Sequence, residues 1–500
     1  MKKDLSYRSY FLTVFLTGSA VLIIEVAAVR VLSPMYGSSL YVLSSVLTII
    51  LAALSLGYWY GGRRADKEQS PMVLYSIIAT SGLFVFVLLL LDKLLLPKLQ
   101  SLLSPQIGPL LFSFGLFFIP TFLLGIVSPY IIKLQSLSTP NEHLGSVVGA
   151  TFFWGTAGSI FGSLVTGFVL IPQLGVTHTI MFVAILLVAL GILTPIVTGY
   201  PLPTTRTVTF LVISVIFCAA LVLIETEQYK NYTYADDGLY SDIKVEDRIF
   251  NNKPARYLLR DANQSSAIYL DSKELALPYA RFVPLYTKLI GDAENALILG
   301  GGAYTVPRTL SYHDPDLHID VIEIEPGLFE LSKKYFDLDN TANITNYVMD
   351  ARVFLQTHDQ KYDFILGDVF GTDLEAPFHL ATYEFYNLIA DHLEPNGLFF
   401  LNVTGVPQAS QPSFIGSITK TLKSVFPNSK AYNFDQDLTS HQNVVFVARK
   451  GEEMIDITAW NMMKISKTVA ELPVTEEYLA GEIILTDDRA PVEYLMSKQM

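Results

Sequence analysis

Glycine and acidic residues follow a series of short apolar runs in the second half of the chain. Three glycines, Gly300, Gly301 and Gly302, come directly after the apolar run 296–299. Glycines let a backbone turn approach a ligand with no Cβ in the way, although an ordinary strand-to-helix turn explains them equally well. Glu323 ends the next apolar run, about 20 residues later. Its carboxylate could accept hydrogen bonds from both hydroxyls of a ribose, and a solvated turn is the alternative.

The same region lacks the patterns that bind phosphate groups. Thr305 occupies the place of the last glycine in G-x-G-x-x-G, and no Lys-Ser/Thr pair follows the glycines. Asp350 ends the segment 347–350 and could accept a hydrogen bond from an adenine amino group. The glycines, Glu323 and Asp350 together therefore indicate a site for a nucleoside without a phosphate, such as an adenosyl sulfonium.

A parallel sheet would bring these residues to one edge. Apolar runs typical of buried strands occur at 296–299, 319–325, 362–368 and 398–403, and they alternate with helical spacing. Such alternation predicts an α/β Rossmann-like domain of the S-adenosylmethionine type over 291–500, with its ligand at the carboxyl ends of the strands. Short alternating segments within 240–275 predict a small antiparallel β subdomain over 226–290.

The first 225 residues have a different composition. They are 8% charged with a net charge of +4, whereas the remaining 275 are 23% charged with a net charge of −17. A stretch with so few charges is not a water-soluble domain, which excludes a simple soluble enzyme. The single cysteine, Cys218, excludes an internal disulfide. The acidic second half has no basic stripe, so we expect no nucleic acid partner.

Seven apolar runs are long enough to cross a bilayer. They lie near 10–31, 40–61, 72–91, 110–133, 146–171, 176–198 and 206–224. Residues 1–225 are therefore predicted to be a polytopic α-helical membrane domain of about seven spans in a lipid bilayer. Eight Lys/Arg fall on the N-terminal side and three on the other, which places the N-terminus in the cytoplasm. An odd number of spans then places the second half outside, unless Pro120 and Pro129 break the fourth run.

Glu25 is an ionisable residue inside the first apolar run, and Arg30 lies near the end of that run. Charged groups at membrane depth are costly, so they mark a functional polar site or a structural pairing. The segment 61–67 is similar to a loop of major-facilitator transporters, and seven runs are too few for that complete fold.

Several short motifs resemble the membrane-fused branch of the spermidine synthase family, the polyamine aminopropyltransferases. They are G-S-S-L-Y-V at 37–42, G-G-R-x-A-D at 61–66, G-F-V-L-I-P at 167–172, T-Y-E-F-Y at 382–386 and L-T-D-D-R-A-P-V-E at 485–493. The resemblance covers nearly the whole chain, and the ordered set of motifs is more specific than any one of them.

The resemblance implies transfer of an aminopropyl group from decarboxylated S-adenosylmethionine to putrescine or a related amine, with release of 5′-methylthioadenosine. It implies a co-substrate and no permanently bound cofactor. Asp368 matches the first acid of the family's D-x-x-D pair, so we expect it to be the catalytic residue. A sulfonium is already a good leaving group, so this carboxylate has mainly to position the amine and accept its proton. Capping of the next turn is the alternative for Asp368.

The chain departs from the family pattern on the amine side. Gly371 stands in place of the second acid, and Asp373 is close to it but out of register. The family's Y-H-E corresponds to Tyr279-Ala280-Arg281. Its L-D-G-x-x-Q corresponds loosely to residues 260–264, where Gln264 lies one position earlier than the glutamine of the motif. We expect the substrate to contact Tyr279, Gln264, Asp373 and His379, although a hydrogen-bonded loop residue is the alternative for His379.

In the family that this chain resembles, the glycine motif continues into an aspartate that disfavours a carboxylate on the donor, and Ala303 stands in that place here. Arg281 and Ala303 together would therefore suit S-adenosylmethionine itself. A methyl- or aminocarboxypropyl-transferase and a membrane sensor or transporter with a ligand-binding synthase-like domain are the two alternatives to an aminopropyltransferase.

The remaining expectations concern metals, partners and location. The histidines show no ligand spacing, so no metal site is proposed. Expected partners are a polyamine or another amine, the lipid bilayer and, as one alternative, a second copy in a homodimer. The expected location is the cell membrane, with the synthase domain in the cytoplasm on chemical grounds, in conflict with the charge distribution.

Overall fold

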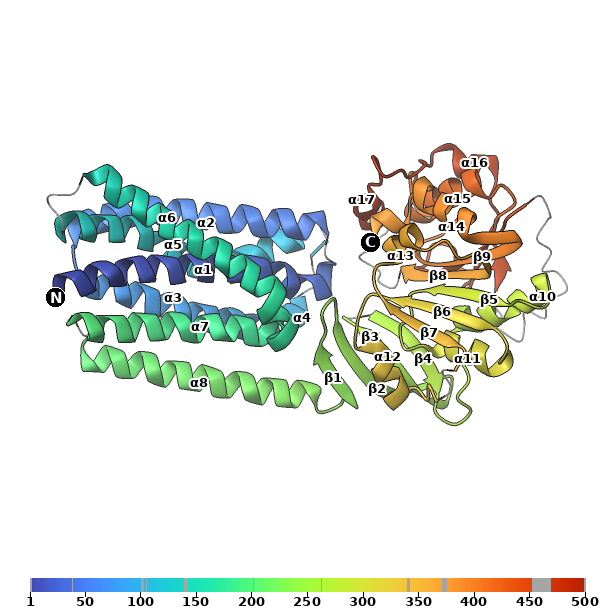
Figure 1. The fold of residues 1–500 in the computed structure, drawn as a ribbon, viewed down its shortest axis with the longest axis horizontal. Coiled ribbons are helices and arrows are strands. Elements are labelled where there is room, and N and C mark those ends of the chain that lie inside the picture. The colour runs from blue at the N-terminus through green and yellow to red at the C-terminus, as the bar shows by residue number, and fades with distance from the viewer. Residues whose placement is uncertain are drawn as a thin grey trace. The chain divides into compact units, whose positions relative to one another are not determined.

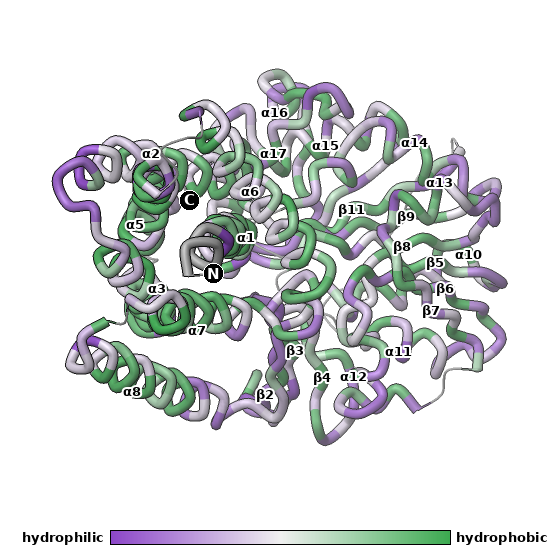
Figure 2. The backbone as a smooth tube through the Cα atoms, turned by 60° about the vertical axis from the view of Figure 1, so that its left-hand side comes forward, coloured by the Kyte–Doolittle hydropathy of each residue, from purple (hydrophilic) through white to green (hydrophobic). Residues whose placement is uncertain are grey.

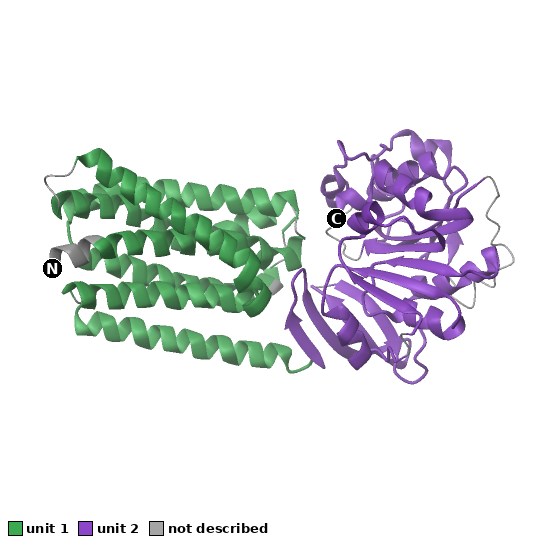
Figure 3. Cartoon of the chain, viewed as in Figure 1, with its two compact units in different colours: residues 1–231 green, residues 232–500 purple. Residues whose placement is uncertain are grey.

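The chain folds into two compact units, residues 1–231 and 232–500 (Figure 3). The structure is a computed structural model. It describes all residues except 1, 38, 100–102, 105, 139–142, 201, 262, 340–341, 371–375, 452–468 and 499–500. The boundary between the units lies six residues beyond the predicted one at 225. Figure 2 shows long hydrophobic stretches along the helices of the first unit, whereas hydrophilic residues recur throughout the second.

The first unit is helical. Its helices are α1 (Lys2–Tyr36), α2 (Leu40–Lys67), α3 (Pro71–Leu94), α4 (Leu96–Leu99), α5 (Gly108–Ser138), α6 (Leu144–Val165), the π-helical η2 (Thr166–Leu170), α7 (Ile171–Thr198) and α8 (Thr204–Tyr229). Six helical segments among the described residues are long and apolar enough to cross a membrane. The fourth predicted run lies in α5, which is continuous with both prolines inside it, so the alternative that Pro120 and Pro129 break this run is wrong.

One of the six segments, Leu144–Thr198, contains two of the predicted runs. Its 55 residues would extend about 80 Å as one helix, far more than the roughly 30 Å of a bilayer core. The backbone leaves the helical region at Gly175, with φ 72° and ψ 178°. The part before Gly175 packs parallel to α1 and the part after it packs antiparallel to α3, so the chain reverses there (Figure 1). The six segments therefore contain seven helical stretches, which correspond to the seven apolar runs in the sequence.

Small residues allow the helices of this unit to pack closely in pairs. In the α1–α6 pair, a Cβ at Gly158 would overlap the carbonyl oxygen of Phe15, and a Cβ at Gly155 would touch Val14. In the α3–α7 pair, a Cβ at Gly82 would lie 2.7 Å from the carbonyl oxygen of Ala184. Close backbone approach of this kind stabilises helix pairs in lipid, where apolar burial contributes little.

The second unit begins with a four-stranded antiparallel sheet in the order β1-β2-β3-β4. Its strands are β1 (Tyr234–Asp237), β2 (Asp242–Phe250), β3 (Lys253–Arg260) and β4 (Asn263–Tyr269). The short helical segments α9 (Pro278–Phe282), η3 (Val283–Tyr286) and α10 (Thr287–Ile290) lead from this sheet to the next.

An eight-stranded sheet in the order β12-β10-β11-β9-β8-β5-β6-β7 forms the core of the second unit. The strands β5 (Asn295–Leu299), β6 (His318–Glu323), β7 (Ile344–Val348), β8 (Tyr362–Phe370) and β9 (Leu393–Gly405) are parallel. The strands β10 (Lys430–Asn433), β11 (Gln442–Arg449) and β12 (Ala470–Glu471) pair antiparallel. The predicted α/β class is confirmed.

Helices cover both faces of this sheet (Figure 1). They are α11 (Thr305–His313), α12 (Leu328–Tyr335), α13 (Ala351–Thr357), η4 (Phe378–Leu380), α14 (Tyr383–His392), α15 (Phe414–Val425), α16 (Glu476–Ala480) and α17 (Val492–Ser497). Alternate residues of β5 enter two separate apolar clusters, with Ile298 in one and Leu299 in the other. The strand order runs outward in both directions from β5 and β8. Ligands bind at the carboxyl ends of such a switch point, where the predicted site residues lie.

Candidate active site

The three glycines after β5 form a turn that packs closely against its neighbours. Gly300 has φ 96° and Gly302 has φ 53°, in the left-handed region that favours glycine. A Cβ at Gly300 would overlap the carbonyl oxygen of Asp368, and a Cβ at Gly302 would lie 2.7 Å from Ser266 Oγ. The glycines therefore bring this turn against β8 on one side and β4 on the other.

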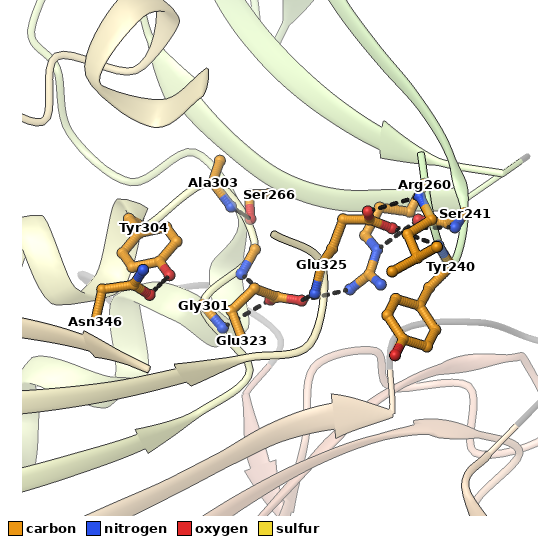
Figure 4. Close-up of polar contacts among 12 residues, drawn as sticks. Tyr240, Ser241, Arg260, Ser266, Gly301, Ala303, Tyr304, Glu323, Glu325 and Asn346 are labelled. Atoms are coloured by element: carbon orange, nitrogen blue, oxygen red, sulfur yellow. Dashed lines mark hydrogen bonds and ion pairs between the residues drawn. The ribbon is translucent and has the colours of Figure 1, made fainter. Parts of the chain in front are cut away.

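Glu323 holds the glycine turn through backbone hydrogen bonds (Figure 4). Its buried carboxylate accepts from Gly301 N at 3.0 Å and Gly302 N at 2.9 Å through Oε2, and from Glu325 N at 3.0 Å through Oε1. Arg260 Nη1 lies 3.7 Å from Oε1. Ribose binding by Glu323 stays a prediction. The acceptor position that a ribose diol could use is the one on Oε1 beside Arg260.

A second carboxylate, Glu325, fixes the turn between β1 and β2. It accepts hydrogen bonds from the backbone nitrogens of Leu239 at 2.8 Å, Tyr240 at 2.8 Å and Ser241 at 3.2 Å. Arg260 Nε also donates to Ser241 Oγ at 3.1 Å. Glu323, Glu325 and Arg260 thus join the small sheet to the glycine turn (Figure 4).

Asp350 caps the N-terminus of α13. Its Oδ1 accepts from Arg352 N at 2.9 Å and Val353 N at 3.0 Å, and its Oδ2 lies 3.1 Å from His379 Nε2. The hydrogen bond from His379 lowers the pKa of the Asp350 carboxyl, which stays ionised as a hydrogen-bond acceptor. Adenine binding by Asp350 stays a prediction, for which Oδ2 keeps one acceptor position. The structure places His379 beside Asp350, so its contact lies at the nucleoside end of the predicted site.

Asp368, in β8, is partly buried and has one hydrogen-bond donor at each carboxylate oxygen. Asn402 Nδ2 donates to Oδ1 at 2.8 Å, and the Tyr279 hydroxyl donates to Oδ2 at 3.2 Å. Burial raises the pKa of Asp368 to about 6, helped by the charge of Glu323 and opposed by the two donors. A carboxylate with a pKa near neutrality can accept a proton from a bound amine and release it to water.

The other residues predicted for the site have no contact with Asp368, Glu323 or Asp350 among the described hydrogen bonds. Gln264 is exposed on β4, two residues before Ser266, whose Oγ accepts from Ala303 N at 3.1 Å. Asp373 and Gly371 lie outside the described residues. Arg281 Nε donates to the carbonyl oxygen of Leu275 at 2.6 Å, and its guanidinium lies 5.3 Å from the centre of the Tyr269 ring. These contacts give no support to Arg281 as the partner of a donor carboxylate.

Several residues of the site were missed at the sequence level: Arg260, Ser266, Glu325, Asn402 and Asn443, whose Nδ2 donates to Asn402 Oδ1 at 3.1 Å. Asn402 had a detectable signal, since it is a single polar residue inside the apolar run 398–403 and is only 3% exposed. Glu325 follows Glu323 by two residues, in the strand ending that the sequence already marked as acidic. Among the described residues, no group of three or more His, Cys, Asp or Glu could hold a metal ion.

Comparison with known proteins gives one matching family model. The model of the spermine/spermidine synthase domain matches residues 282–457. A polyamine aminopropyltransferase of Vibrio vulnificus is 30% identical over 217 residues, which cover 42% of this chain and 69% of that protein.

Two further relatives match over different lengths. A probable polyamine aminopropyl transferase of Bifidobacterium longum is 30% identical over 227 residues, or 41% of this chain, and the match spans only half of that relative's length. Polyamine aminopropyltransferase 1 of Streptomyces coelicolor is 24% identical over 476 residues, which cover 88% of this chain and 84% of that protein.

Among solved structures, a probable spermidine synthase from Corynebacterium glutamicum is similar, with 20% identity and a TM-score of 0.44. The match covers 51% of this chain and 96% of that one.

Proposed function

The chain belongs to the spermine/spermidine synthase family, and we propose that it transfers an aminopropyl group from decarboxylated S-adenosylmethionine to an amine such as putrescine. The names of the relatives support the aminopropyl group and the amine. One observation carries the proposal for this chain: Asp368, whose carboxyl has a pKa of about 6, has its backbone carbonyl against the glycine turn at the switch point of the sheet.

The proposed reaction is a direct displacement at carbon. The amine nitrogen attacks the aminopropyl carbon bonded to the sulfonium sulfur, the new C–N bond forms, and the C–S bond breaks with its electrons passing to sulfur. The products are the aminopropylated amine and 5′-methylthioadenosine. Asp368 holds the amine and accepts the proton that the nitrogen loses, while Tyr279 and Asn402 hold the carboxylate in place.

The donor would bind across the carboxyl ends of β5, β6 and β7. We propose that the glycine turn approaches the nucleoside, that Glu323 Oε1 accepts from the ribose, and that Asp350 Oδ2 accepts from adenine. The proposed roles of Glu323 and Asp350 rest on the acceptor positions that their backbone hydrogen bonds leave open. Gln264, Asp373 and His379 are proposed to contact the substrates.

We propose that the first unit anchors the enzyme in a bilayer, because its helices are long and apolar enough to cross one. We place the second unit in the cytoplasm, where a nucleoside sulfonium donor is made and used. Seven crossings then put the N-terminus outside, against the Lys/Arg distribution, so membrane topology requires a direct test.

A second candidate function is methyl or aminocarboxypropyl transfer from S-adenosylmethionine. The observation that favours it is Ala303, which puts a methyl group where the family pattern has a carboxylate. The Ala303 side chain is a methyl group, so it offers no charge to repel a donor carboxylate.

Calorimetric titration of the detergent-purified full chain with each donor tests the two candidates. At least ten-fold tighter binding of the decarboxylated donor, about 1.4 kcal/mol, is expected for an aminopropyltransferase. The reverse preference would favour the second candidate, and binding of neither donor would favour a sensor or transporter. Asp368→Asn should abolish transfer from the bound donor, and Asp391→Asn, at an exposed acid, serves as the matched control.

A further inference from the structure

The Asp368 carboxylate is held by groups from two different directions. Tyr279, from α9, donates to Oδ2, and Asn402, from β9, donates to Oδ1. A carboxylate oxygen can accept two hydrogen bonds, so each oxygen keeps one position for another donor. The two donors together restrain rotation of the carboxylate about its Cβ–Cγ bond, with those positions left for an incoming ammonium.

The orientation of the Asn402 amide depends on a third residue. Asn443 Nδ2 donates to Asn402 Oδ1 at 3.1 Å and lies 3.5 Å from Thr404 Oγ1. An amide oxygen cannot donate a hydrogen bond. Because Asn443 occupies the oxygen of Asn402, the nitrogen of Asn402 faces Asp368, and the flipped amide would put two acceptors together.

The strand register explains how these side chains meet. β9 and β11 are antiparallel neighbours in which Asn443 lies opposite Thr404 and Val445 lies opposite Asn402. Side chains alternate along a strand, so Asn402 and Thr404 share a face with Asn443, which is diagonal to Asn402. A buried amide between Leu401 and Val403 is costly without hydrogen bonds, and here its nitrogen and its oxygen each have one.

We propose that Asn402 and Asn443 are positioning residues, which hold the Asp368 carboxylate oriented and ionised for proton transfer from the acceptor amine. This inference deepens the proposed function and rests on it for the role of Asp368. Asn402 acts directly on Asp368, and Asn443 acts by fixing the amide of Asn402.

The groups around Asp368 set the direction of the expected effect. The titratable groups that face it among the described residues are Tyr279 and Glu323. Burial and the charge of Glu323 raise the pKa of Asp368, whereas Asn402 and Tyr279 lower it. Loss of the Asn402 donor should therefore raise this pKa further, so less of the carboxylate would be ionised at neutral pH.

The decisive measurement is the titration midpoint of Asp368 itself. Infrared difference spectroscopy of the protonated carboxyl band measures this midpoint. Each full-length protein is compared with its counterpart that also carries Asp368→Asn. Asn402→Leu, which is nearly isosteric, should raise the midpoint by about one pH unit. Asn443→Leu should raise it by less. Thr404→Val removes a hydroxyl that contacts Asn443 and the Phe370 carbonyl oxygen, and it should leave the midpoint unchanged.

Kinetics provide the second measurement. The acidic limb of the pH profile for transfer should move upward with the titration midpoint, a change that a purely structural role would not produce. If Asn402→Leu does not fold, Asn443→Leu at a partly exposed position carries the test. An unchanged midpoint in a folded variant at either position would overturn the inference. If wild type transfers no aminopropyl group and Asn402→Leu still raises the midpoint, the positioning of Asp368 is supported and the proposed function is overturned.

Discussion

Replacement of Asp368 by asparagine should abolish transfer and stabilise the second unit at alkaline pH. A pKa of about 6 in the folded chain, against 3.8 for an unperturbed aspartate, means that the folded state binds its proton more tightly than the unfolded state. Below pH 3.8 both states are protonated and the carboxyl contributes no penalty. As pH rises through the interval from 3.8 to about 6, the stability of the folded state falls, and the penalty is complete above it.

The size of this penalty follows from the pKa difference. About two units correspond to at most about 3 kcal/mol, since one unit is about 1.4 kcal/mol. Asparagine removes the charge and can keep both contacts, because its oxygen can accept from Asn402 Nδ2 and its nitrogen can donate to the Tyr279 hydroxyl oxygen. The variant should therefore recover much of the penalty.

Hydrogen exchange of the β5 and β8 amides in the full chain measures the effect, because it reports opening of the second unit without unfolding the first. Wild type and variant are compared at the same pH. Asp368→Asn should protect these amides more than wild type at pH 8, and the difference should shrink toward zero near pH 4. Asp391→Asn should change neither. A variant equally destabilised at both pH values would refute the argument that ionisation of the buried Asp368 carboxyl destabilises the folded state.

Three further predictions concern other parts of the chain. Gly158→Leu should destabilise the helical unit by several kcal/mol, because any Cβ there overlaps the Phe15 carbonyl oxygen. Thermal unfolding in detergent tests this against the control Gly149→Leu, because Gly149 faces open space. Equal effects of the two substitutions would contradict the prediction. Glu325→Gln should weaken the three backbone contacts of the 239–241 turn, so exchange there should rise by roughly ten-fold, and unchanged exchange would show that the turn is held by other contacts. Reporters fused to the two termini should be active on opposite sides of the membrane, with the C-terminal one in the cytoplasm; reporters on the same side would show that the reversal at Gly175 does not complete a crossing.

Local patterns predicted most of the architecture. Alternating apolar runs and helical spacing predicted the parallel strands, and runs of about 20 apolar residues predicted the helices of the first unit. The same patterns divided Leu144–Thr198 into the runs 146–171 and 176–198, and the backbone reversal lies at their junction, at Gly175. Packing of α6 against α1 and of α7 against α3 identifies that reversal.

The acids and glycines of the candidate site were predictable from the sequence, whereas their hydrogen-bond partners were not. The glycines, Glu323, Asp350 and Asp368 each lie at or near the carboxyl end of a strand, and parallel strands place such ends at one edge. Partners from distant segments were not predictable in this way. Asn402 reaches Asp368 across 34 residues, and Tyr279 reaches it across 89, through a pairing of elements that no local spacing encodes.

The sequence by itself determined the division of this chain into an apolar helical unit and a charged α/β unit, the strand ends that carry its acids, and the family to which it belongs. The first two follow from composition and side-chain periodicity, and the family follows from the resemblance of short motifs; all are local properties. Only the tertiary structure decided which hydrogen bonds each acid makes: Glu323 with the glycine turn, Glu325 with the 239–241 turn, and Asp368 with Asn402. The reason is physical, since the pKa and orientation of a carboxylate depend on burial and on donors that the fold brings to it from elsewhere in the chain.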